Sequence, residues 1–143
     1  MRRFGEAVKS GQKYTIRPGA YAILPKWGGL LCTLERLEDW EVQLPGGGID
    51  PGENPIAALH REVFEETGWK IATPRKVGTY TRFCYMAEYD LWAQKVCHIY
   101  TALPVRKHSD PLESHHTALW LSPEEALTQL ANSGDRHFLQ RVI

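Results

Sequence analysis

Residues 47–69, GGIDPGENPIAALHREVFEETGW, decide the fold because they join a glycine-rich loop to a segment with the start and stop signals of a helix. Asn54 is a typical N-cap residue, and Pro55 suits the first helical position. Gly68 can end the helix in a left-handed backbone conformation. We therefore expect a helix over residues 55–67.

Three carboxylates crowd one flank of this predicted helix. At about 100° per residue, Glu62, Glu65 and Glu66 fall within an arc of about 100°. Like charges three or four residues apart destabilise an exposed helix by a few tenths of a kcal/mol per pair, so a cation is expected to offset them. Mg²⁺ suits this role because it prefers oxygen ligands and keeps waters for a phosphate substrate. The alternative is a solvated charged face. The apolar face beside these carboxylates is formed by Ile56, Leu59 and Val63.

Arg61 lies at the edge of the same group. It can pair with Glu65 four residues later, or reach back to Glu53 just before the helix cap. An arginine fork that binds a carboxylate has a fixed geometry. Such a pair would fix the point at which the loop meets the helix.

The spacing of these residues resembles the Nudix box: Gly47, five residues, Glu53, seven residues, then REVFEETG at 61–68. The chain is identified on this match as a member of the Nudix hydrolase family, with the box at residues 47–69. Trp69 departs from the family pattern, which usually has an aliphatic residue there. The resemblance implies an α/β (α+β) fold, a Nudix-type α/β/α sandwich with a mixed β-sheet and a loop-helix-loop motif. With 143 residues, one domain over 1–143 is the simplest expectation.

The same resemblance implies a hydrolase that depends on Mg²⁺ or Mn²⁺ and cleaves a pyrophosphate bond. Its substrate would be a nucleoside diphosphate linked to another group. The general base stays open between Glu62, Glu65 and a residue outside the box. The implied metal ligands are Gly47 through its carbonyl, Glu62, Glu65 and Glu66, and the implied catalytic residues are Glu53, Arg61, Glu62 and Glu65.

A polar stretch before Trp120 holds candidates outside the box. Glu113, His115 and His116 lie in the region from which relatives of the family bring a further acid or base, and Glu113 is the candidate for substrate contact. The alternative interpretation of this stretch is an exposed loop.

Three arginines and one tyrosine are further candidates for substrate binding. An arginine fork meets phosphate oxygens bidentately, which makes Arg17, Arg36 and Arg82 candidates, although each is also typical of an ordinary surface charge. Tyr85 stands beyond the box at a position where a tyrosine resembles the diadenosine polyphosphate branch of the family. Cys84 occupies the position of the proline that marks many ADP-ribose hydrolases.

These features leave several substrates open. The leading hypothesis is a nucleoside triphosphate, oxidised or not, or a dinucleoside polyphosphate. Residues 40–53, WEVQLPGGGIDPGE, also resemble the RNA 5′-pyrophosphohydrolase group, although the spacing differs. Two further alternatives are an ADP-ribose or sugar-nucleotide pyrophosphatase and a non-catalytic Nudix-like ligand-binding module.

The composition limits the partners. Seventeen Lys and Arg balance 17 Asp and Glu, so the net charge is zero and no stable nucleic-acid complex is expected. No apolar run reaches the roughly 18–20 residues of a membrane span, and the first residues lack the apolar core of a signal peptide, so we expect a cytoplasmic protein without membrane contact. The three cysteines, Cys32, Cys84 and Cys97, are interpreted as core residues.

The rest of the chain predicts strands and two further helices. Segments 13–24 and 30–35 are expected to form a hairpin, whose apolar surface suits a homodimer. Ser122 and Glu125 form a capping box at the start of a later helix. The remaining expected strands are 40–44, an antiparallel pair at 76–90 and 95–105, and Trp120-Leu121; the remaining helices are 123–132 and 135–142.

Overall fold

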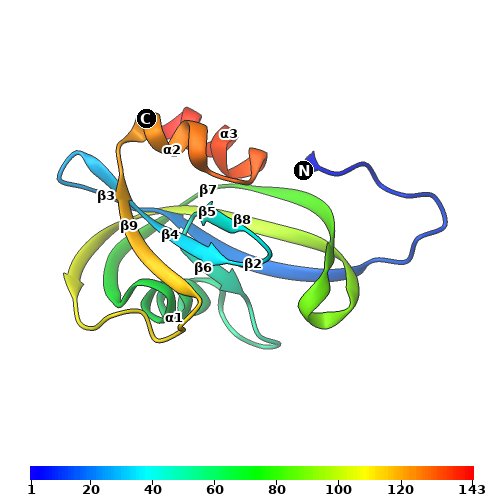
Figure 1. Ribbon diagram of the computed structural model, residues 1–143, viewed down its shortest axis with the longest axis horizontal. Coiled ribbons are helices and arrows are strands. Elements are labelled where there is room, and N and C mark those ends of the chain that lie inside the picture. Colours follow the sequence, from blue (N-terminus) through cyan, green and yellow to red (C-terminus); the bar gives the residue numbers. More distant parts are fainter.

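The computed structural model describes residues 1–143. Its strands are β1 (Arg2–Gly5), β2 (Thr15–Ile23), β3 (Pro25–Lys26), β4 (Gly29–Arg36), β5 (Trp40–Gln43), β6 (Gly46–Gly48), β7 (Trp69–Met86), β8 (Leu91–Lys107) and β9 (His116–Leu121). Its helices are α1 (Pro55–Thr67), α2 (Pro123–Gln129), α3 (Ser133–Val142) and the short 3₁₀ helix η1 (Ala87–Tyr89). Helix α1 lies on one side of the strands, and α2 and α3 lie on the other (Figure 1). This layering confirms the expected sandwich.

The strands form two sheets. One has the order β1-β7-β8-β2-β6, in which β1 is parallel to β7, β2 is parallel to β8, and the other pairs are antiparallel. In the other sheet, β4 pairs with β3, β5 and β9, all antiparallel. The mixed sheet is as expected.

Local signals set the ends of α1 as the sequence predicted. The Asn54 side chain accepts a hydrogen bond from the Ile56 N–H at 2.8 Å, and Gly68 ends the helix at a φ of 76°. Leu59 and Val63 are fully buried. Ile56, on the same face in the first turn, is 41% exposed.

The predicted hairpin between residues 13–24 and 30–35 is wrong over most of its length. β2 lies between β8 and β6, whereas β4 belongs to the other sheet. The chain crosses between the sheets after Ile23, so only the two-residue β3 pairs with β4 as a hairpin. The apolar hairpin that would have supplied a dimer surface therefore does not form, and the homodimer stays a prediction.

The later elements agree with the sequence in type and differ in length. The expected antiparallel pair is confirmed as β7 and β8, both longer than predicted. β9 has six residues instead of two, and α2 stops at Gln129 because Leu130 leaves the helical conformation, with a ψ of 126°. β1 and the glycine strand β6 were not predicted, because each depends on a partner strand elsewhere in the chain.

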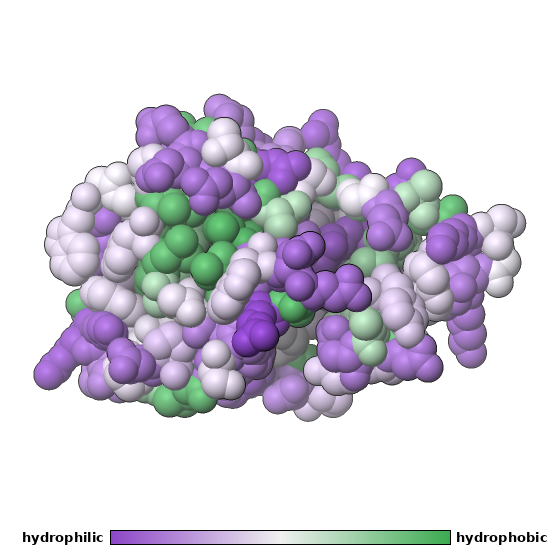
Figure 2. Space-filling view, in the orientation of Figure 1, coloured by the Kyte–Doolittle hydropathy of each residue, from purple (hydrophilic) through white to green (hydrophobic).

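Two hydrophobic clusters form the core, one toward α2 and α3 and one under α1. Trp69 packs in the cluster under α1. Cys32 and Cys97 are buried in the first, and burial raises the pKa of their thiols to about 12 and about 11, in keeping with a core role. Figure 2 shows further hydrophobic side chains on the face formed by β4, β5 and β9 below α2. No helix is long and apolar enough to cross a membrane.

Candidate active site

The site is built where β6 passes the flank of α1. The Gly46 N–H donates a hydrogen bond of 3.0 Å to Glu66 Oε1. Gly46 has a φ of 148° and lies so close to β2 that a Cβ would be 2.1 Å from the Ala20 carbonyl oxygen. At Gly47 a Cβ would be 2.4 Å from Glu62 Oε2. Glycine in the loop thus lets the backbone approach two helix carboxylates directly.

Arg61 joins the loop to the helix. Its Nε and Nη2 atoms donate to the two carboxylate oxygens of Glu53 at 2.9 and 2.8 Å, and Nη2 also donates to the Gly48 carbonyl at 3.1 Å. Its Nη1 atom lies 2.9 Å from Glu62 Oε1 and 3.5 Å from Glu65 Oε1. These hydrogen bonds hold the pKa of Glu53 at about 2 and raise the pKa of Arg61. Both pairings of Arg61 expected from the sequence are present.

Glu113 approaches the carboxylates of α1 from the loop before β9. One oxygen each of Glu62, Glu65 and Glu113 lies within 4.8 Å of the others. His115 pairs with Glu113 at 3.0 Å. The fold thus brings this loop next to the carboxylates of the box, and a catalytic or substrate-binding role of the loop stays a prediction.

His116 differs from the expected exposed loop residue. Its side chain is only 3% exposed, because the residue begins β9 and pairs with Glu35 of β4. His116 Nε2 lies 3.5 Å from Glu66 Oε2, 3.5 Å from Glu113 Oε2 and 4.0 Å from Glu35 Oε1. Burial and the nearby His115 lower the pKa of His116. Glu35 was not predicted from the sequence, since no motif marks it and only strand pairing brings it here.

The electrostatics of this cluster suit a cation. Burial raises the pKa of Glu66 well above its usual range, and burial also raises the pKa of Glu62 and Glu35. Nearby like charges add to the rise at all three. A divalent cation would offset both effects, and carboxylate and carbonyl oxygens are the ligands that Mg²⁺ and Mn²⁺ prefer. The residues present therefore fit such a metal.

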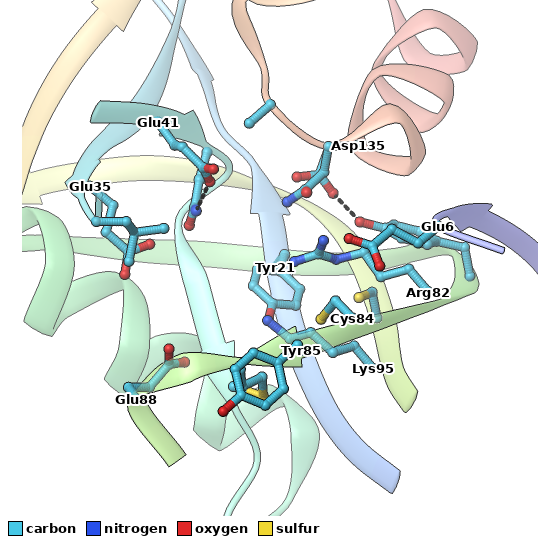
Figure 3. Close-up of a pocket in the computed structure, with 17 residues that line it drawn as sticks. Glu6, Tyr21, Glu35, Glu41, Arg82, Cys84, Tyr85, Glu88, Lys95 and Asp135 are labelled. Atoms are coloured by element: carbon cyan, nitrogen blue, oxygen red, sulfur yellow. Dashed lines mark hydrogen bonds between the residues drawn. The ribbon is translucent and has the colours of Figure 1, made fainter. Parts of the chain in front are cut away.

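A hollow next to this carboxylate cluster, called the Arg82 hollow below, lies between the two sheets and α3 (Figure 3). It has a volume of about 400 Å³. Arg82 and Lys95 extend into it around Tyr21, and Asp135 lies at the α3 end (Figure 3). Asp135 is buried and accepts a 2.7 Å hydrogen bond from the Tyr80 hydroxyl, and burial raises the pKa of its carboxyl group.

The Arg82 hollow is continuous with the cleft that runs beside the glycines of β6. Tyr21, Glu35 and Lys95 line both the Arg82 hollow and the cleft beside the glycines of β6, which also contains Glu62 and Glu66. Asn132 and Asp135 were not predicted as site residues. Asn132 directly precedes α3 and Asp135 lies in its first turn, and only the tertiary fold brings them to a cavity.

The remaining candidates lie in different surroundings. Arg17 lines the cleft beside β6, with its guanidinium 4.8 Å from the centre of the Tyr89 ring. Arg36 is exposed at the end of β4 and lines none of these hollows. Tyr85 lines the Arg82 hollow, where its hydroxyl donates to Asp90 and its ring packs against Trp92 at 5.2 Å.

Comparisons with known proteins identify the family of this chain. The NUDIX domain family model matches residues 17–142, so the chain belongs to the Nudix family, as the resemblance predicted. It is similar to a putative 8-oxo-dGTP diphosphatase of Bacillus subtilis, with 35% identity over 74 residues, 52% of this chain and 50% of that protein. It is also similar to an RNA pyrophosphohydrolase of Agrobacterium fabrum, with 58% identity over 31 residues, 22% of this chain and 18% of that protein. These matches thus span half or less of the relatives' length.

A solved structure shows the same fold. The NUDIX hydrolase from Nitrosomonas europaea superimposes with a TM-score of 0.73 over 88% of this chain and 87% of that one. The two sequences are 20% identical, so this likeness concerns the fold alone.

Proposed function

We propose that this chain is a divalent-metal-dependent hydrolase that cleaves a pyrophosphate bond in a nucleoside diphosphate linked to another group. The proposed substrate is a nucleoside triphosphate, oxidised or not, or a dinucleoside polyphosphate. The observation that carries the proposal is the gathering of Glu62, Glu65 and Glu113 within 4.8 Å, next to a glycine loop and the buried Glu66. Such a cluster is costly in a protein without a cation.

The metal would be Mg²⁺ or Mn²⁺, held by Glu62, Glu65, Glu66 and the carbonyl of Gly47. When bound, such an ion neutralises phosphate oxygens and lowers the pKa of a coordinated water. The proposed role of the remaining residues is to keep these ligands in position and to accept the proton of the attacking water.

Arg61 and Glu53 act as positioning residues in this proposal. The bidentate pair holds the loop against the helix, and the third donor group of Arg61 turns Glu62 toward Gly47. Because the pKa of Glu53 is held at about 2, this carboxylate stays ionised over the whole physiological range. It is therefore suited to orientation and unsuited to proton transfer.

The general base has to accept a proton from the attacking water. A base works best when its pKa lies near the working pH. Glu62 and Glu65 are the two candidates within the box, and Glu62 lies against the loop glycine Gly47. Glu113 lies close enough to both to contact the same water or the substrate.

The Arg82 hollow is proposed to hold the nucleoside part of the substrate. Its volume of about 400 Å³ lies within the range of small-molecule sites. Arg82 and Lys95 supply positive charge in this hollow, and Lys95 also lines the cleft that contains Glu62 and Glu66. Asn132 and Asp135 offer hydrogen bonds to a base. A nucleotide could thus span both hollows, with its phosphates toward β6.

Hydrolysis at the triphosphate 5′ end of RNA is the second candidate. It is favoured by the 58% identical stretch shared with the Agrobacterium fabrum RNA pyrophosphohydrolase. A non-catalytic binding role is a weaker candidate because the full carboxylate set is present. ADP-ribose is a weaker candidate substrate because Cys84 stands where many ADP-ribose hydrolases have a proline.

The test is chromatographic analysis of the products formed from nucleoside triphosphates, oxidised triphosphates, dinucleoside polyphosphates, ADP-ribose, sugar nucleotides and triphosphorylated RNA, with release of phosphate and pyrophosphate measured as well for the triphosphates and the RNA. Each is measured with Mg²⁺, with Mn²⁺ and with chelator. Chelator-sensitive turnover of a triphosphate or dinucleoside polyphosphate supports the proposal. Turnover confined to RNA moves the assignment to the second candidate, and the absence of turnover with every metal contradicts the catalytic proposal.

A further inference from the structure

Two histidines and a glutamate meet beside the carboxylates of the box. One donor atom each of Glu35, His115 and His116 lies within 4.8 Å of the other two, and these residues are called the histidine cluster below. His115 directly precedes β9, His116 begins it, and their ring centres are 4.3 Å apart. Glu35 is the partner of His116 in the ladder between β4 and β9. The pairing of these two strands thus brings the three side chains together.

The His116 ring lacks the hydrogen bonds that a buried imidazole normally makes. Its side chain is 3% exposed, and Nδ1 has no hydrogen-bond partner. Nε2 lies 3.5 Å from Glu66 Oε2 and from Glu113 Oε2, beyond the range of an ordinary N–H···O hydrogen bond. Buried polar side chains in native proteins are almost always paired, and a bound ion is one of the established reasons for an exception. The ring is therefore free to act as a ligand.

The donor atoms of the histidine cluster differ in kind from those of the box. The proposed metal ligands of the box are all oxygens, which suit Mg²⁺. Imidazole nitrogens are softer donors, and sites that contain them bind Zn²⁺, Co²⁺ and Ni²⁺ more tightly than Mn²⁺. Two imidazoles and one carboxylate are a known ligand set for Zn²⁺. The chemistry of the cluster thus selects a transition-metal ion of the zinc class over Mg²⁺.

The geometry of the cluster needs only a small adjustment to hold such an ion. Bonds of about 2.0–2.2 Å from Zn²⁺ to nitrogen and oxygen place tetrahedral donor atoms roughly 3.3 Å apart. Donor atoms within 4.8 Å of one another reach this spacing when each moves by about 1 Å or less. The side chains of Glu35 and His115 are 19% and 47% exposed, so both have room to turn toward the buried His116 ring.

Glu113 orients one of the two histidines. Its Oε2 atom lies 3.0 Å from His115 Nε2, which leaves Nδ1 of that ring for an ion. Histidines that bind a metal through one nitrogen usually donate the N–H of the other to a carboxylate or carbonyl, which fixes the ring. Glu113 also belongs to the group that it forms with Glu62 and Glu65. It therefore lies between the histidine cluster and the carboxylates of the box.

The surroundings of the cluster are strongly acidic. The hollow that contains all three residues is lined by no lysine or arginine and by five glutamates, Glu35, Glu62, Glu66, Glu88 and Glu113. A single divalent ion in the box offsets only part of this charge. A second cation beside Glu35 and Glu113 would offset more of it and would lower the cost of gathering these carboxylates.

We propose that Glu35, His115 and His116 form a second metal site, which binds a transition-metal ion of the zinc class and is separate from the metal site of the box. Glu35 lines the Arg82 hollow, the cleft beside β6 and the acidic hollow, so the ion lies where these three spaces meet. The proposal concerns ion binding alone. It goes beyond the proposed hydrolase activity and does not depend on it.

The main experiment is calorimetric titration of Zn²⁺ into the full chain, stripped of metal and dialysed into excess Mg²⁺. The wild type should bind one Zn²⁺. The test variants are His115→Gln and Glu35→Gln, because both side chains reach solvent. Loss of a group that only supports a metal ligand costs about 10- to 100-fold in affinity, so loss of a ligand should raise the Kd by roughly a hundred-fold or more. The matched control is His60→Gln, an exposed position of α1 outside the cluster, which should leave the Kd unchanged.

Co²⁺ provides a spectroscopic readout of the same site. Its visible absorption becomes stronger when six water ligands are replaced by a four-coordinate site with nitrogen donors. The wild type with Co²⁺ should show this absorption, and Zn²⁺ should abolish it by displacing Co²⁺. His115→Gln should lack the absorption, although its Tm without metal should match that of the wild type.

A variant of the box separates the two metal sites. Glu65→Gln removes a proposed ligand of the box and should leave the Kd for Zn²⁺ near that of the wild type. Loss of Zn²⁺ binding in Glu65→Gln with normal binding in His115→Gln would place the ion in the box and overturn the proposal. So would an equal Kd in the wild type and both test variants, or no binding of Zn²⁺ by the wild type.

Activity measured in parallel distinguishes this proposal from the proposed function. A wild type that binds Zn²⁺ through His115 and shows no turnover with any metal supports the second metal site and contradicts the hydrolase. A wild type that turns over a nucleotide with Mg²⁺ and binds no Zn²⁺ does the reverse.

Discussion

The carboxylate of Glu62 lies directly against the Cα of Gly47. A methyl group at this glycine would come within 2.4 Å of Oε2 and 2.5 Å of the carboxylate carbon. The loop residue whose carbonyl is a proposed metal ligand and the helix residue whose carboxylate is another thus fix each other's position. A shift of either residue would displace one of the proposed metal ligands.

Gly47→Ala should therefore lower metal-dependent turnover far more than it lowers stability. Displacing a reacting group by about 1 Å can cost roughly a hundred-fold in rate. Gly48→Ala is the control, because a Cβ there meets nothing within 4 Å. The measurement is kcat with Tm for both variants. Equal losses of rate in the two would show that the contact at Gly47 has no special role.

The Arg61–Glu53 pair predicts a specific dependence of stability on pH. Arg61 lowers the pKa of Glu53 from 4.5 to about 2 in the folded protein. A carboxyl group whose pKa is lower in the folded protein than in the unfolded chain stabilises the fold at pH values above its unfolded-state pKa. This contribution is lost as the pH falls through the pKa of the folded state. The free energy of unfolding of wild type minus Glu53→Gln should be positive near neutral pH and shrink between pH 4.5 and about 2. Urea unfolding at a series of pH values measures it, and a difference that stays constant over that interval would refute the pairing.

The contribution of Asp135 to stability should depend on pH in the opposite sense. Burial raises the pKa of its carboxyl group above 3.8, so its contribution to stability is present below the unfolded pKa and is lost as the pH rises through the folded pKa. Asp135→Asn keeps an acceptor for the Tyr80 hydroxyl and removes the buried charge. The variant should be more stable than wild type near neutral pH, with the gain vanishing in acid, and should show a higher KM for the nucleotide. An unchanged KM would argue against nucleoside binding in the Arg82 hollow.

The capping box of α2 predicts a simple loss of stability. The Ser122 side chain accepts a hydrogen bond from the Glu125 N–H at 3.1 Å, and the Glu125 side chain accepts one from the Ser122 N–H at 2.8 Å. Ser122→Ala should lower the free energy of unfolding by about 1 kcal/mol with kcat unchanged. Chemical denaturation measures the first quantity, and no loss of stability would show that the cap is not needed.

Local signals explain which elements the sequence predicted well. The bounds of α1 were predicted because Asn54 and Gly68 act on the backbone within one turn of the helix. The pairing of Arg61 with Glu53 and Glu65 could also be predicted from the sequence, because the loop is short and the helix fixes the spacing of these residues.

Contacts between distant segments explain the failures. The pairing of β2 with β8 and not with β4 depends on which strand best covers each exposed edge, and residues 13–24 carry no sign of that choice. Likewise, Glu35 and Asp135 reach their hollows only through strand pairing and helix packing. Each looks in sequence like an ordinary polar residue.

The most direct test of the proposed hydrolase is turnover of the best substrate by wild type and Glu62→Gln, with Mg²⁺ and with chelator. Glu124→Gln, a change at an exposed position of α2, is the control for losing one carboxylate. The proposal predicts a loss of several orders of magnitude in kcat for Glu62→Gln, with Tm near that of the wild type and full activity in the control. Turnover in Glu62→Gln at the wild-type rate, or turnover that persists in chelator, would contradict the proposed metal-dependent hydrolysis.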